Sequence, residues 1–109
     1  MKNNNNNKFE EYYNLRSRLR EKYNTENIQR LKESIESKVT VRYNHTIIKA
    51  TSIDLSSYTI KFLFADPKDI EKAKTYVENC IIDELYNLFS INLPFVDSFV
   101  LADELRFII

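Results

Sequence analysis

Glycine is absent from this 109-residue sequence, and its absence excludes several kinds of site. Glycine-rich phosphate loops need backbone that can approach a phosphate without an intervening Cβ atom. A P-loop, a dinucleotide-binding fingerprint and a G-x-S-x-G nucleophile elbow are therefore excluded. Tight turns must use asparagine, aspartate, serine or histidine in place of glycine.

Reactive side chains and long apolar runs are also scarce. Tryptophan is absent, and Cys80 and His45 are the single residues of their kinds, so no intrachain disulfide can form. Met1 and Lys2 precede five asparagines, which is not the pattern of a secretory signal. No apolar run approaches the ~20 residues of a membrane span. We therefore expect a cytoplasmic protein that does not enter a membrane.

The charge is balanced overall but divided unevenly along the chain. Residues 1–49 hold eleven Lys/Arg against six Asp/Glu, a net charge of +5, and residues 50–109 hold five against ten, a net charge of −5. The two halves can attract each other within the fold or between copies of the chain. The basic half can also meet an anionic partner.

The N-terminal part is typical of two helices after an asparagine-rich tail. Residues 1–7 are expected to be disordered, and 8–109 to form a single α+β domain. Apolar side chains recur at helical spacing over 8–23 and again over 25–37. The apolar faces of the two stretches differ by roughly 130°, which predicts a break near Asn24 and Thr25.

Three strands are predicted next, linked as an antiparallel meander. Residues 38–43 alternate between apolar and polar side chains, which is typical of a half-buried strand. Asn44 and His45 stand where a two-residue turn belongs, because asparagine tolerates the left-handed conformation. Further strands are predicted over 46–54 and 58–65, separated by a turn at 55–57.

A long helix and an apolar C-terminal segment complete the chain. Asp66 and Pro67 begin the helix, and apolar residues at spacings of three and four continue it to about Ser90. Pro94 prevents further helix. From 95 to 102 both faces are apolar, which predicts a strand buried on both sides, followed by a turn at 103–104 and another strand over 105–109.

No residue constellation in the sequence is specific for catalysis. His45 is expected to serve as a turn residue, and Cys80 as a small hydrophobe on the long helix. Glu84 is expected at the rim of that helix. The pairs Asp83–Glu84 and Asp103–Glu104 are adjacent in sequence, so on a helix their side chains would point about 100° apart. We expect no catalytic, cofactor-binding or metal-binding residues.

Basic residues in the N-terminal helices suggest a second kind of function. Arginine beside tyrosine suits phosphate contact and base stacking. The candidates for nucleic-acid contact are Arg16, Arg18, Arg20, Lys22 and Arg30. Their spacing spreads the charges around the helix, and neighbouring glutamates dilute them, so a solvated helix face is the alternative.

The sequence therefore predicts an α+β fold with two N-terminal helices, a three- to four-stranded antiparallel sheet, one long helix packed on the sheet and a C-terminal strand. The leading hypothesis is a non-enzymatic protein–protein interaction module, such as an inhibitor, adaptor or chaperone-like protein, that self-associates as a homodimer. Nucleic-acid binding is the alternative, and a small carboxylate enzyme the third hypothesis. The candidate partner-binding residues are Phe95, Phe99, Leu101, Leu105, Phe107 and Ile109.

Overall fold

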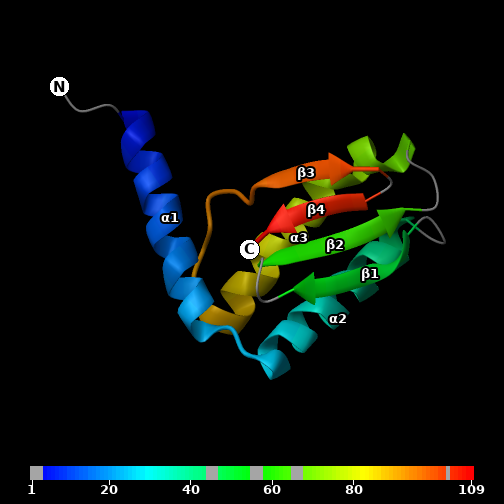
Figure 1. The fold of residues 1–109 in the computed structure, drawn as a ribbon, viewed down its shortest axis with the longest axis horizontal. Helices are drawn as coiled ribbons and strands as arrows, with labels where there is room; N and C mark the ends of the chain where they lie inside the picture. The colour runs from blue at the N-terminus through cyan, green and yellow to red at the C-terminus, as the bar shows by residue number, and fades with distance from the viewer. Residues whose placement is uncertain (1–3, 44–46, 55–57, 65–67, 103) are drawn as a thin grey trace.

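The computed structural model confirms the α+β fold class (Figure 1). It describes residues 4–43, 47–54, 58–64, 68–102 and 104–109, with side chains described for 9–39, 41–42, 58–64, 68–102 and 104–109. The elements in these residues are α1 (Asn4–Lys22), α2 (Thr25–Tyr43), β1 (Ile47–Asp54), β2 (Thr59–Phe64), α3 (Lys68–Phe89), β3 (Ser98–Leu101) and β4 (Glu104–Ile108).

The break between the first two helices lies where the sequence predicts it. The Asn24 side-chain oxygen accepts a hydrogen bond from the Asn27 amide at 2.9 Å, and the Asn24 amide donates to the Asn27 side-chain oxygen at 2.8 Å. This reciprocal pair caps the first turn of α2. Helix α1 begins at Asn4, four residues before the predicted start. The disorder expected for 1–7 stays a prediction.

The strand predicted over 38–43 is wrong, because these residues continue α2 to Tyr43. The apolar stripe of α2 runs through Leu31 and Ile35 to Val39, all fully buried, whereas Val41 is 82% exposed. Val39 follows Ile35 by four residues and so keeps the same helix face toward the core. The hairpin expected at Asn44 and His45 lies outside the described residues.

The described strands form one antiparallel sheet in the order β1-β2-β4-β3. The predicted pair over 46–54 and 58–65 is confirmed as β1 and β2, with the turn at 55–57 outside the described residues. The C-terminal segment returns through β3 and β4, and β4 lies between β2 and β3. The C-terminal strand therefore pairs within the chain.

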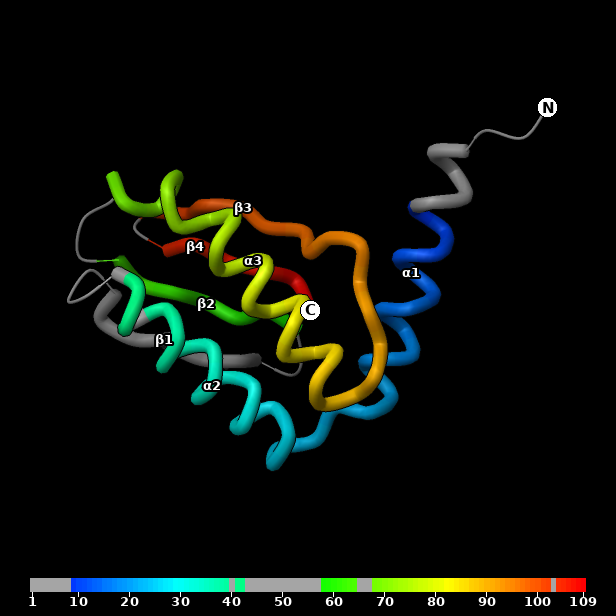
Figure 2. Tube along the Cα trace, turned by 180° about the vertical axis from the view of Figure 1, so that it is seen from behind, coloured from blue at the N-terminus to red at the C-terminus, as the bar shows by residue number. Residues whose placement is uncertain are grey.

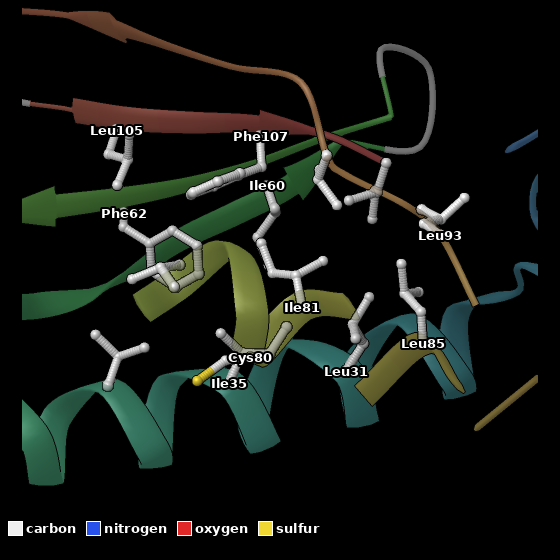
Figure 3. Close-up of a cluster of buried hydrophobic side chains, with 14 of the residues drawn as sticks. Leu31, Ile35, Ile60, Phe62, Cys80, Ile81, Leu85, Leu93, Leu105 and Phe107 are labelled. Atoms are coloured by element: carbon white, nitrogen blue, oxygen red, sulfur yellow. The ribbon is translucent and has the colours of Figure 1, made fainter. Parts of the chain in front are cut away.

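Among the described residues, helices cover one face of the sheet and leave the other open. Helices α2 and α3 lie together on one face, as Figures 1 and 2 show from opposite sides. The core between the layers joins the inward faces of β2 and β4 to both helices (Figure 3). Residues Ile60 and Phe62 from β2 and Leu105 and Phe107 from β4 are fully buried there.

Helix α3 is the element that the sequence predicts best. Its buried side chains recur at helical spacing: Ile70, Ala73, Val77, Cys80, Ile81 and Leu85. The predicted start at Asp66 and Pro67 lies outside the described residues. The helix ends at Phe89, and Ser90, with φ of 58°, donates its amide to the Tyr86 carbonyl at 2.7 Å. A left-handed residue after the last helical one is a common helix C-cap, usually glycine.

Helix α1 closes one end of the sheet through the segment that leads to β3 (Figure 1). The Tyr12 ring stacks on Phe95 at 4.1 Å between centroids, and the Tyr12 hydroxyl accepts a hydrogen bond from the Asp97 amide at 3.4 Å. The Val96 amide donates to the Glu78 carboxylate at 3.0 Å, which fastens the same segment to α3. The strand predicted over 95–102 therefore begins only at Ser98.

Candidate functional site

Strand β3 is one of the two edge strands of the sheet, and its side chains are exposed. Three consecutive apolar side chains on it face solvent: Phe99 is 41% exposed, Val100 43% and Leu101 53%. The prediction of a strand buried on both faces is wrong, because side chains are exposed on both: Phe99 and Leu101 on the open face, and Val100 on the helix face. The order of the strands along the chain does not predict that β3 is an edge strand, because β4 follows β3 in the chain but lies between β3 and β2 in the sheet.

The main chain of β3 presents alternate residues to its open side. The Ile108 amide donates to the Asp97 carbonyl at 2.9 Å, and the two residues continue the register that pairs Ser98 with Phe107. Hydrogen-bonded pairs alternate along an antiparallel ladder. Phe99 and Leu101 are therefore bonded to β4, whereas the amide and carbonyl groups of Ser98 and Val100 point away from it.

Two rows of side chains cross the open face of the sheet toward this edge. In one row Lys61 of β2, Arg106 of β4 and Phe99 of β3 are neighbours. In the other, Leu63, Glu104 and Leu101 are neighbours.

Each row has its own charge on β4. The Arg106 guanidinium donates to the Glu104 carboxylate at 2.6 Å and lies 5.8 Å from the centre of the Phe99 ring. The basic row thus extends over the edge strand, while the other row carries the acidic Glu104.

The predicted partner-binding residues divide between this edge and the core. Phe99 and Leu101 are exposed on β3, as a docking role requires. Phe95 is partly buried against Tyr12. Three others, Leu105, Phe107 and Ile109, are fully buried in the chain's own core, so a partner cannot reach them without opening the fold. The sequence prediction missed Val100, whose main-chain groups point away from β4 and whose side chain, on the helix side of the sheet, is 43% exposed.

The basic candidates are only partly available to a nucleic acid. The Arg16 guanidinium lies 3.7 Å from the Asp97 carboxylate and 4.9 Å from the centre of the Tyr13 ring. The Arg20 guanidinium lies over the Tyr58 ring at 4.2 Å, and burial, followed by the charge of Arg16, lowers the pKa of Arg20. The remaining candidates are exposed: Arg18, Lys22 and Arg30.

Basic residues of the first half of the chain form ion pairs with acidic residues of the second half. Besides Arg16 and Asp97, Lys38 of α2 lies 2.9 Å from the Glu84 carboxylate on α3. This hydrogen bond raises the pKa of Lys38. The Glu84 side chain, expected at the rim of the helix, is only 13% exposed and lies against Lys38. Both contacts join a basic residue of 1–49 to an acidic residue of 50–109.

The reactive side chains in the described part of the chain do not converge. Cys80 is buried in the core, and burial raises the pKa of its thiol while a hydrogen bond with Tyr76 lowers it. A hollow of about 460 Å³ is lined by Lys38, Asp83, Tyr86, Asn87 and Asn92, and neither Cys80 nor Glu84 lines it. His45 and Asp103 lie outside the described residues. Among those described, no group of three potential ligands could hold a metal ion.

Comparisons with known proteins give no match from which a function could be argued. No protein-family model matches the chain, and neither a curated protein nor a solved structure matches it. Among the described helices, none combines the length and apolar character needed to cross a membrane.

Proposed function

We propose that the chain is a non-enzymatic protein–protein interaction module that binds an extended segment of its partner along β3. One observation carries the proposal: a sheet edge with outward main-chain groups at Ser98 and Val100 also exposes Phe99, Val100 and Leu101. Strand addition to such an edge uses main-chain hydrogen bonds for affinity and alternate side chains for specificity.

The composition of β3 supports this proposal. Soluble proteins protect sheet edges with lysine, proline, bulges or a covering helix. The four residues of β3, Ser98–Leu101, include no charge and no proline, and their pairing with β4 has no bulge. An edge of this kind associates with another strand unless something covers it.

The side chains of β3 indicate the partner's chemistry. Phe99 and Leu101 extend the open face of the sheet, and Val100 lies on the same side as the buried Leu105. An added strand therefore needs apolar residues at alternate positions opposite Phe99 and Leu101. An inhibitor, adaptor or chaperone-like protein fits these properties. We keep the cytoplasmic location in the proposal, because the single Cys80 is a free thiol.

A single substitution separates the edge from the rest of the fold. Val100→Pro removes the outward amide of β3 and, because that amide does not bond to β4, leaves the ladder inside the sheet intact. The matched control is Val100→Thr, which keeps the amide and the β-branched shape. The probe is a displayed library of random peptides, selected against the unmodified chain and then tested on both variants.

We expect the selected peptides to carry alternating apolar residues. Their affinity for Val100→Thr should stay within a few-fold of that for the unmodified chain, and their affinity for Val100→Pro should fall by more than tenfold. Equal binding to both variants would overturn the proposal. Nucleic-acid binding is the opposing outcome. It would show as RNA or DNA binding that weakens steeply with salt and is lost on charge reversal at Arg18 and Lys22.

A further inference from the structure

We infer that the strand added to β3 is β3 of a second copy, in antiparallel register with Val100 opposite Val100. This inference rests on the proposed function and names its partner. The two-fold axis stands perpendicular to the sheet at Val100, so the two sheets continue through the interface. Helices α2 and α3 of both copies then lie on the same side of the joined sheet.

The main chain of β3 permits few registers. Outward-facing residues of one copy must oppose outward-facing residues of the other, because only these have unused amide and carbonyl groups on that side. Ser98 and Val100 meet this condition. The registers with good overlap therefore place Val100 opposite Val100, with Phe99 opposite Leu101, or Ser98 opposite Val100, with Phe99 opposite Phe99.

Charge on the open face distinguishes these two registers. With Phe99 opposite Phe99, the basic rows of both copies would lie end to end across the interface, with an Arg106 guanidinium 5.8 Å from each Phe99 ring. With Phe99 opposite Leu101, the row holding Lys61 and Arg106 continues into the row of the second copy that holds Glu104. The two-fold axis repeats this match, so basic meets acidic twice.

The side chains of β3 also suit the register with Val100 opposite Val100. Each Phe99 packs against Leu101 of the other copy on the open face, so these two exposed side chains of the edge cover one another. Val100 meets Val100 on the helix side. The net charge of the chain is zero, so two copies approach without overall repulsion.

Cysteine cross-linking tests the register directly, in a Cys80→Ala background that removes the native thiol. In the inferred register the Cα atoms of two residues 100 lie about 5.5 Å apart, within the range of a disulfide. Two residues 99 are diagonal neighbours about 7–8 Å apart and cannot be bridged. Val100→Cys is therefore expected to cross-link on mild oxidation, and Phe99→Cys alone to form no cross-link.

A mixture of Phe99→Cys and Leu101→Cys is the complementary arm, and it is expected to cross-link although neither variant does so alone. Light scattering of the unmodified chain at tens of micromolar is expected to show a dimer, and the Val100→Pro chain a monomer. Circular dichroism confirms that each variant is folded before it is compared.

Cross-linking of Phe99→Cys with itself would overturn the inferred register. A monomer by light scattering, with no cross-link from any variant, would overturn self-association. That failure is distinct from failure of the proposed function, which the peptide selection decides: peptides that bind Val100→Thr and not Val100→Pro would leave β3 as a binding edge for another protein.

Discussion

Tyr23 at the junction of α1 and α2 gives the sharpest test of the packing. Its hydroxyl donates a hydrogen bond to the main-chain oxygen of Ile109 at 2.9 Å, and its ring lies 5.6 Å from Phe89 and 6.2 Å from Tyr58. Tyr23→Phe keeps the ring and removes the hydroxyl. The loss of one partly buried hydrogen bond lowers the free energy of unfolding by about 1 kcal/mol at neutral pH.

At alkaline pH the Tyr23→Phe variant should become more stable than the wild type. Burial raises the pKa of Tyr23 well above its ordinary value of 10.0, and the charge of Arg20 opposes this shift. Below that ordinary value both folded and unfolded chains keep the proton, so the stability is fully present. Above it the unfolded chain releases the proton first, and the wild type loses about 1.4 kcal/mol of stability per pH unit.

The phenylalanine variant has no proton to lose at this position. At roughly pH 11 the wild type has therefore lost about 1.4 kcal/mol that the variant keeps, which exceeds the hydrogen bond of about 1 kcal/mol. Urea unfolding of both proteins from neutral pH to about pH 11, followed by circular dichroism, measures the difference. A difference in the free energy of unfolding between the two proteins that stays constant with pH would refute the reasoning, because it would mean that burial does not hold the proton on Tyr23.

Three further predictions concern other parts of the fold. Ser90→Gly should raise the free energy of unfolding by about 0.5–1 kcal/mol, because glycine adopts the left-handed φ of 58° without steric cost; an unchanged midpoint in urea would contradict this. Ile81→Ala should lower the free energy of unfolding by about 2–5 kcal/mol, since Ile81 is fully buried between the sheet and α2, and a loss below 1 kcal/mol would mean that the site is loosely packed. The Cys80 thiol, buried and with a raised pKa, should react with a thiol reagent at least about tenfold more slowly in the folded chain than in urea, and equal rates would place it at the surface.

The spacing of apolar residues is enough to predict an element when that spacing fits only one kind of secondary structure. The stripe of α3 is one example, because its spacing of three and four is incompatible with a strand. The break at Asn24 is another, because the apolar faces of α1 and α2 point in different directions on either side of it.

Residues 38–43 show where local pattern fails. Alternation at Val39 and Val41 fits a strand, but Val39 also fits the helical stripe from Ile35, and two periodicities overlap in so short a stretch. The structure follows the helix, in which Val39 is buried in the core and Lys38 reaches Glu84. The partners that bury and bind these residues lie elsewhere in the chain, Glu84 being 46 residues away, and leave no signal in the segment itself.

The candidate site depends on the same kind of distant information. Strand β4 carries Glu104 and Arg106 and β3 carries no charge, so composition does not mark β4 as the central strand or β3 as the edge strand. Their order follows from the pairing of β4 with β2, about forty residues earlier in the chain. Three predicted contact residues on or beside β4 are therefore core residues, whereas Phe99 and Leu101 are exposed.

The alternating main chain of β3 has a consequence for amide hydrogen exchange. The amides of Phe99 and Leu101 bond to β4, while those of Ser98 and Val100 face outward. Within four residues the strand thus holds two shielded amides and two that exchange freely until the edge is occupied. The ratio of the two rates reports occupancy of this edge separately from unfolding, since unfolding would release all four together.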